Sequence, residues 1–135
     1  MKTKYNPLVS ILIANYNNEV YLKKCLDSVL NQKYKKIEVI VVDDYSNDNS
    51  LNILNKYKNS IKIIKNKKKT KYGSFNQINA YQLGFKKSKG KIIFFLDSDD
   101  YFKNNKVKKV LNYFDKRYAK SARIEDLLSK VKKNK

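Results

Sequence analysis

Residues 8–44, LVSILIANYNNEVYLKKCLDSVLNQKYKKIEVIVVDD, form the stretch of sequence that decides the fold. It begins with an apolar run from Leu8 to Ala14 that is typical of a buried strand. After a polar turn, apolar residues recur at helical spacing across 19–32. A second apolar run from Ile37 to Val42 then ends in two aspartates. The stretch therefore predicts a strand, a helix and a second strand, which is the repeating unit of a parallel sheet.

The rest of the chain continues this alternation of strands and helices. We predict a helix carrying Leu51 and Leu54, a strand over 61–64, a helix over 74–87, a strand over 91–96 and a helix over 106–114. In the helix over 74–87, Ile78, Gln82 and Phe85 lie along one side. The order predicts an α/β fold with a mostly parallel, Rossmann-like sheet of about four strands flanked by helices.

The chain length favours one domain. The 135 residues suit a single core, which we assign to residues 1–115, followed by a basic helical tail over 116–135. The lysine-rich segment 65–71 predicts an exposed loop. In the tail, Glu125 and Asp126 stand beside apolar residues, which indicates the polar side of an amphipathic helix and not a catalytic base. Packing over the sheet, contact with an anionic membrane and binding of a partner chain all remain open for this tail.

The composition excludes several kinds of chemistry. The chain has no histidine, so catalysis by Ser-His-Asp or Cys-His sets is excluded. A single cysteine without histidine also argues against a structural zinc site. The three glycines fit neither a Walker A loop nor a GxGxxG motif. Carboxylates remain as the groups for polar chemistry.

Charge is the strongest bulk feature, with 31 Lys and Arg against 12 Asp and Glu and a net charge of +19. Such an excess attracts polyanions, but it equally fits lysines spread over a solvated surface. The single cysteine favours a reducing cytoplasm, the apolar runs are too short to span a bilayer, and no secretory h-region is visible. We therefore expect a cytoplasmic protein, and peripheral contact with the inner face of the cell membrane stays open.

Carboxylates gather where the last predicted strand ends, at Asp97, Asp99 and Asp100. Aspartates at i and i+2 beyond a strand can converge on a hard divalent cation, which prefers oxygen ligands. Such an ion can hold a diphosphate and neutralise the charge that develops on it as a leaving group. The alternative is a helix start with Ser98, Asp99 or Asp100 as its cap. Spacing alone leaves both interpretations open.

A second acidic pair, Asp43 and Asp44, closes the second predicted strand. A carboxylate there can accept hydrogen bonds from a nucleotide base or a ribose. The alternative is an Asx turn before the next helix, and the two roles can coexist. Tyr16 follows the first strand, where its ring could stack on a base or simply occupy a turn. Ligands of parallel sheets bind beyond the carboxyl ends of the strands, so all these residues are candidates for one site.

These motifs carry a family resemblance. PLVSILIANYNNEVYLKKCLDSVLNQKYKKIEVIVVDDYSND together with GKIIFFLDSDD resembles the N-terminal half of family-2 glycosyltransferases with the GT-A fold, over residues 6–115. The resemblance implies that Ala14 and Tyr16 flank the nucleotide base, with Tyr16 stacking on it. It also implies that Asp44 binds the base, most often uracil in this family, with Asp43 assisting nearby.

The same resemblance implies a metal and diphosphate site at the FLDSDD motif. Asp97 and Asp99 match the DxD motif that holds the ribose and the Mg²⁺ or Mn²⁺ on the diphosphate, with Asp100 beside them. Ser98, inside the motif, is assigned to donor binding as well. Many relatives carry an arginine near the diphosphate on the preceding helix, where this chain has Ala-Tyr-Gln over 80–82. Gln77 or lysines in the 67–71 segment are candidates to replace that cation.

The implied function is inverting transfer of a sugar, most often from a UDP-sugar, to an acceptor hydroxyl in cell-surface glycan synthesis. The implied partners are a nucleotide-sugar donor and a glycan or lipid-linked acceptor. In the family a carboxylate base lies in an acceptor half that follows the DxD motif, and the sequence after Phe114 does not resemble it. We therefore expect the general base to be absent.

Three alternatives remain open. They are a truncated inactive remnant that forms a homo-oligomer, one part of a split enzyme that needs a partner chain, and a basic module that binds polyanions. Nucleic acid is not the expected partner, because the acidic strand ends would repel its phosphates.

Overall fold

The structure, a computed structural model, describes residues 5–66 and 73–114. The prediction of a mostly parallel sheet flanked by helices is confirmed. Strands and helices alternate in the order β1 (Val9–Asn15), α1 (Glu19–Leu30), β2 (Ile37–Asp43), α2 (Ser50–Lys56), β3 (Lys62–Lys65), α3 (Gly73–Lys87) and β4 (Ile92–Asp97). A further helix begins at residue 106 and is described as far as residue 114. The predicted tail over 116–135, including Glu125 and Asp126, and most of the predicted 65–71 loop lie outside the described residues.

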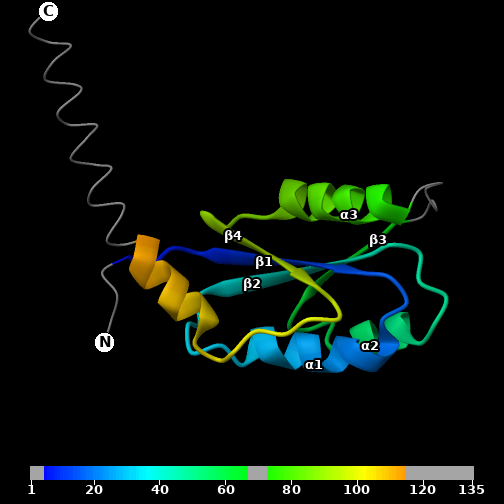
Figure 1. The fold of residues 1–135 in the computed structure, drawn as a ribbon, viewed down its shortest axis with the longest axis horizontal. Coiled ribbons are helices and arrows are strands. Elements are labelled where there is room, and N and C mark those ends of the chain that lie inside the picture. The colour runs from blue at the N-terminus through cyan, green and yellow to red at the C-terminus, as the bar shows by residue number, and fades with distance from the viewer. Residues whose placement is uncertain (1–4, 67–72, 115–135) are drawn as a thin grey trace, which may run out of the picture.

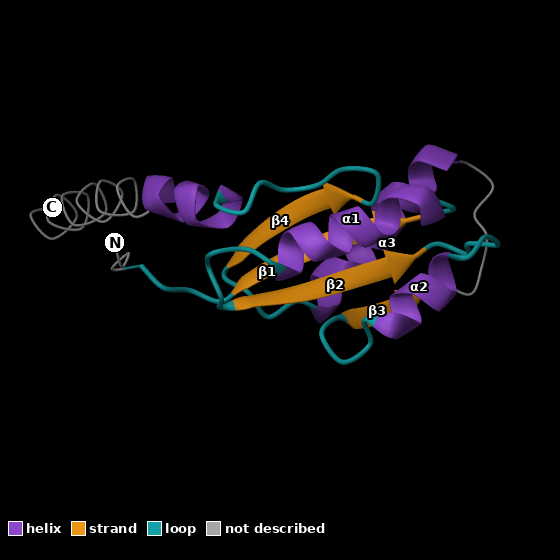
Figure 2. Ribbon diagram, turned by 90° about the horizontal axis from the view of Figure 1, so that it is seen from below, coloured by secondary structure: helices purple, strands orange, loops and turns teal. Residues whose placement is uncertain are grey.

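The four strands form one parallel sheet in the order β3-β2-β1-β4. Consecutive parallel strands need a crossover, which the helices supply. Figure 1 shows α3 on one face of the sheet and α1 and α2 on the other, and Figure 2 shows α1 and α2 from their own side. The chain therefore adds β2 and β3 on one side of β1, and then returns over the opposite face to place β4 on the other side.

The main core lies between the sheet and α1 and α2. Alternate residues of β1 and β2 point into it, and α1 supplies the stripe that its helical spacing predicted. The helix over 106–114 adds Val107 and Leu111, both fully buried. None of the helices within the described residues is long and apolar enough to cross a membrane.

Helix α3 packs in a way that its apolar pattern did not predict. Ile78 and Phe85 share a helix side with Gln82, yet they are 53% and 59% exposed. The helix instead faces the sheet through Ala80, which is fully buried, and Gly84. A Cβ at Gly84 would stand 3.4 Å from side-chain atoms of Leu12 and Val42, so the missing side chain lets the helix lie close to the strands.

Candidate functional site

The acidic cluster lies at the carboxyl end of β4. Asp97 ends the strand, and a turn follows in which the Asp100 backbone N–H donates to the Asp97 carbonyl at 3.0 Å. One carboxylate oxygen each from Asp97, Asp99 and Asp100 can be chosen so that all three lie within 4.8 Å of one another. The next helix begins only at residue 106, so the alternative of a helix cap at these residues is wrong. Three convergent carboxylates are a donor set that suits a hard divalent cation.

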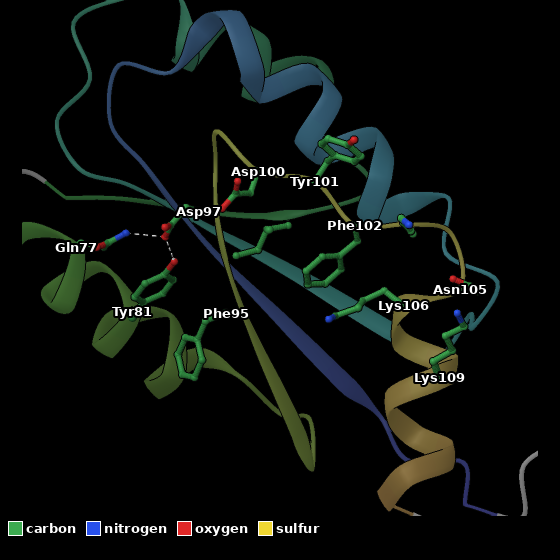
Figure 3. A pocket seen from close by; sticks show the side chains of 12 residues that line it. Gln77, Tyr81, Phe95, Asp97, Asp100, Tyr101, Phe102, Asn105, Lys106 and Lys109 are labelled. Atoms are coloured by element: carbon green, nitrogen blue, oxygen red, sulfur yellow. Dashed lines mark hydrogen bonds between the residues drawn. The ribbon is translucent and has the colours of Figure 1, made fainter.

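Two side chains of α3 hold the Asp97 carboxylate. The Gln77 amide nitrogen donates to Asp97 Oδ1 at 2.5 Å, and the Tyr81 hydroxyl donates to the same oxygen. Figure 3 shows both reaching Asp97 from α3. The Tyr81 ring packs edge-on against Phe95 of β4, with 5.0 Å between ring centroids. Burial, and then the hydrogen bond to Asp97, raises the pKa of Tyr81, so the hydroxyl stays a donor at neutral pH.

A buried cysteine of α1 packs beneath the acidic cluster. Cys25 is fully buried, and its Sγ lies 3.8 Å from the Asp97 carbonyl oxygen. Burial, followed by the charges of Asp100, Asp99 and Asp97, raises the pKa of the thiol to about 12. Cys25 is therefore an uncharged packing residue at neutral pH and adds no thiolate to the site.

Helix α1 and the residues that flank it also fix the loop that carries the cluster. The Asn18 amide donates to Ser98 Oγ at 2.7 Å, and Ser98 is fully buried. Ser28 Oγ accepts the Phe102 backbone N–H at 3.0 Å. Gln32 is likewise buried, and its amide nitrogen donates to the Lys103 carbonyl at 2.7 Å. These bonds hold both ends of the turn that presents the carboxylates.

Asp43 is buried and fully engaged within the protein. Its Oδ1 accepts from the Asn15 amide at 2.8 Å and from Ser46 Oγ at 2.7 Å. Its Oδ2 accepts the Ser46 backbone N–H at 3.0 Å. Asn15 and Asp43 are register partners at the ends of β1 and β2, which brings their side chains together. Asp43 therefore ties two strand ends to the loop before α2, and its assistance to a ligand stays a prediction.

Asp44 differs from its neighbour although it is equally buried, with 3% of its surface exposed. Its Oδ1 accepts from the Asn66 amide at 2.8 Å. Its Oδ2 is buried and has no hydrogen-bond partner among the described residues. A buried carboxylate oxygen without a donor is costly, so this atom is suited to accept an N–H or O–H from beyond the described residues.

The predicted residues at the end of β1 lie between the acidic cluster that follows β4 and the Asp43–Asp44 pair at the end of β2. The Ala14 carbonyl accepts the Ser98 backbone N–H at 3.3 Å, which links the end of β1 to the acidic turn. Tyr16 is 44% exposed, so its ring is accessible. Asn17 has a positive φ of 49° and receives the Asn47 backbone N–H on its side-chain oxygen at 2.8 Å. Contacts of Ala14, Tyr16 and Ser98 with a ligand stay predictions.

A pocket of about 810 Å³ opens between α3, β4 and the helix over 106–114. Figure 3 shows it running from the carboxylates toward Lys106 and Lys109. Its lining residues are Gln77, Tyr81, Phe95, Leu96, Asp97, Asp100, Tyr101, Phe102, Lys103, Asn105, Lys106 and Lys109. One end is acidic, the middle is aromatic and the other end is basic, so the pocket can hold a cation and an anionic group at opposite ends.

Sequence reasoning missed four side chains of this region. Asn15 and Ser46 complete the Asp43 network, Asn66 holds Asp44, and Tyr81 holds Asp97. The strand register could have paired Asn15 with Asp43, because both stand at the ends of neighbouring parallel strands. Tyr81 carried no such signal, because its contact depends on how closely α3 approaches the sheet.

The comparisons with known proteins fit this geometry. The model of the family described as glycosyl transferase family 2 matches residues 10–128. An uncharacterized glycosyltransferase of Haemophilus influenzae is 41% identical over 111 residues, which cover 79% of this chain and 42% of that protein. The Escherichia coli UDP-Glc:alpha-D-GlcNAc-diphosphoundecaprenol beta-1,3-glucosyltransferase WfaP is 39% identical over 108 residues, covering 80% of this chain and 41% of WfaP.

A solved structure agrees in fold as well as in sequence. The crystal structure of S. aureus TarS 1-349 in complex with UDP-GlcNAc superposes with a TM-score of 0.69 at 30% identity, covering 82% of this chain and 32% of that one. The chain thus spans about two fifths of the length of the two curated relatives described above. Given the match to the family model over most of its length, the chain belongs to glycosyl transferase family 2.

Proposed function

We propose that this domain binds a UDP-sugar through a divalent cation held by Asp97, Asp99 and Asp100. Within a complete glycosyltransferase, it would serve inverting transfer of the sugar to an acceptor hydroxyl in cell-surface glycan synthesis. The names of similar proteins support the donor class, since WfaP is described as using UDP-Glc and TarS was solved with UDP-GlcNAc.

The observation that carries the proposal is the buried Oδ2 of Asp44, which has no hydrogen-bond partner within residues 5–66 and 73–114. Uracil offers an N3–H donor that a carboxylate oxygen can accept, and such a bond to a charged group is worth about 1.5–3 kcal/mol. Asp44 stands beside the end of β1, where its backbone N–H donates to the Asn15 carbonyl at 2.9 Å. The exposed ring of Tyr16 belongs to the same strand end and is assigned to stacking on the base.

The acidic cluster supplies the second half of donor binding. Its three carboxylates would hold Mg²⁺ or Mn²⁺, which prefer oxygen ligands and retain positions for phosphate oxygens. Such an ion, when bound, stabilises the charge on the departing nucleoside diphosphate. Ser98 is assigned to the donor side through its place between two ligands. Asp97 takes part both as ligand and as a neighbour of the ribose.

We assign the acceptor to a region of the pocket and not to individual contacts. We place a glycan or lipid-linked acceptor hydroxyl at the aromatic and basic part of the pocket, next to Tyr101 and Lys106. The residue that deprotonates this hydroxyl is not assigned to the described part of the chain. A cytoplasmic location at the inner face of the membrane would fit a lipid-linked acceptor, and the net charge of +19 would favour an anionic membrane surface.

Calorimetry with UDP and UDP-GlcNAc, with and without Mn²⁺, tests the proposal. We expect metal-dependent binding by the full chain and its loss in Asp99→Ala, whose exposed side chain contributes no described hydrogen bond to the fold. Asp27→Ala is the matched control, because it also removes one carboxylate, from a half-buried position of α1 outside the site, where Asp27 pairs with Lys23 and accepts from the Tyr57 hydroxyl. Absence of nucleotide binding together with tight, salt-sensitive binding to RNA or DNA would overturn the proposal in favour of a polyanion-binding module.

A further inference from the structure

The Asp97 carboxylate is held asymmetrically. Both α3 donors, Gln77 and Tyr81, reach its Oδ1. Its Oδ2 receives no side-chain hydrogen bond from the described residues. A carboxylate on an otherwise free side chain rotates about its last bond, and two donors on one oxygen restrict that rotation. One oxygen thereby accepts both α3 donors, and the other keeps its lone pairs free of the described side-chain donors, in a carboxylate that converges with those of Asp99 and Asp100.

We propose that Tyr81, assisted by Gln77, is a positioning residue that fixes Asp97 for metal binding. The inference deepens the proposed function and rests on it. Partners of metal-binding carboxylates orient their ligands in this way, and their loss commonly lowers metal affinity 10–100-fold. Tyr81 would act through Asp97 alone, without touching the ion.

The chemistry of the two donors supports this role. An amide and a hydroxyl both stabilise the carboxylate anion, and neither carries a positive charge. A lysine or arginine at the same place would also donate, but its charge would repel a divalent cation only a few ångströms away. Neutral donors therefore orient Asp97 and leave the full negative charge of the cluster for the ion.

The ring of Tyr81 is itself fixed. Its edge-on contact with Phe95 joins α3 to β4 two residues before Asp97, on the same face of the strand. Neighbouring Ala80 is fully buried against the sheet, and this packing restricts movement of the helix turn that carries Tyr81. The hydroxyl is thus presented to Asp97 by packed elements, as a positioning role requires.

Mn²⁺ titrations followed by electron paramagnetic resonance test the proposal on the full chain, alone and with UDP. Tyr81→Phe removes the hydroxyl and keeps the ring against Phe95. We expect the Mn²⁺ affinity to fall roughly 10- to 100-fold while the urea midpoint of unfolding stays within error of wild type. Tyr21→Phe is the matched control, because it removes a tyrosine hydroxyl at an exposed position of α1 that has no described side-chain hydrogen bond and no assigned role in the site.

Two more variants separate the effect of orientation from the effect of charge. Gln77→Leu removes the other donor at an exposed position, so the fold is not threatened, and we expect a smaller loss of Mn²⁺ affinity. Tyr81→Arg restores a donor but adds a cation, and we expect weaker Mn²⁺ binding than in Tyr81→Phe.

Wild-type Mn²⁺ affinity in Tyr81→Phe, or an equal loss in Tyr21→Phe, would refute the positioning role and leave the proposed function standing. If wild type binds neither Mn²⁺ nor UDP, both fail together.

Discussion

Adjacent aspartates at the end of β2 offer a matched pair of substitutions with opposite expected results. Asp43 and Asp44 are 1% and 3% exposed, and each Asp→Asn change removes one negative charge. Asp43 accepts three described hydrogen bonds over its two oxygens. Asp44 accepts one, from Asn66, and its Oδ2 is buried with no donor in the part of the chain that the structure describes. The two substitutions therefore test whether Oδ2 of Asp44 accepts a hydrogen bond from a bound ligand.

Asp43→Asn should destabilise the fold. An asparagine that turns its NH₂ group toward the Ser46 backbone N–H places a donor against a donor. One that turns it toward Asn15 meets the amide nitrogen there, unless the Asn15 side chain also flips to present its Oδ1, which has no described partner. Leaving a buried donor unsatisfied costs about 1–3 kcal/mol, and we expect a loss of roughly 2–3 kcal/mol in the free energy of unfolding.

Asp44→Asn should leave stability intact and impair binding. The asparagine oxygen can keep the bond from Asn66, and a neutral amide replaces a charged oxygen that had no partner. We expect the free energy of unfolding to stay the same or rise by up to about 1 kcal/mol. UDP affinity should fall roughly tenfold or more, because a hydrogen bond to a charged group is worth about 1.5–3 kcal/mol.

Urea denaturation at pH 7 gives the two stabilities, and calorimetry with UDP and Mn²⁺ gives the affinities. The reasoning is refuted if Asp44→Asn loses as much stability as Asp43→Asn, because Oδ2 would then have a partner within the protein. It is equally refuted if Asp44→Asn binds UDP as tightly as wild type.

Two further predictions concern contacts away from the site, at the amino ends of β1 and β4 and beside β2. In Gly90→Ala the new Cβ would stand 2.5 Å from the Ser10 backbone nitrogen and 2.9 Å from the Val9 carbonyl carbon, so urea denaturation should show a loss of at least about 1–3 kcal/mol. Gly84→Ala, whose Cβ would meet only side chains at 3.4 Å, should lose less, and equal losses would contradict this packing argument. Burial raises the pKa of Glu38, but hydrogen bonds from the Lys89 N–H, Ser10 and the Gly90 N–H outweigh it and hold the pKa below its ordinary 4.5. The ionised Glu38 side chain therefore stabilises the fold fully above pH 4.5, and this stabilisation is lost as the pH falls through the folded-state pKa. The free energies of unfolding at pH 7 and pH 3 should accordingly differ less in Glu38→Gln than in wild type. An unchanged difference would show that Glu38 has no such role.

The fold was largely predictable because its signals are local. Apolar strands, helical spacing and turn residues placed the seven named elements within a few residues of their observed bounds. The side on which α3 packs was not predictable in this way. The apolar spacing favoured Ile78 and Phe85 as the residues that face the sheet. In the structure Ala80 and Gly84 face it, because close approach of helix and strands requires small residues there. Propensity therefore found the helix, and tertiary packing decided its orientation.

The candidate site was predictable in its carboxylates and not in its donors. Asp97, Asp99 and Asp100 follow a buried strand directly, so their convergence needs only the end of that strand. The partners of Asp44 and Asp97 come from elements 16 or more residues away in the sequence. Whether these partners reach Asp44 and Asp97 depends on the order of the strands and on how closely α3 approaches the sheet. No local pattern in a single sequence encodes either of these.

The strand order explains why the carboxylates gather where they do. From β1 the chain adds β2 and β3 in one direction, with α1 and α2 on one face, and then crosses the other face through α3 to place β4 on the free side of β1. Helices leave β1 and approach β4 on opposite faces, so no crossover covers the carboxyl ends of these two strands. Open α/β sheets bind ligands at such a switch point. Asp97 ends β4 there, and Asp44 directly follows β2 on the other side of β1, so the topology alone separates the proposed metal-binding part of the site from the proposed base-binding part by the width of β1.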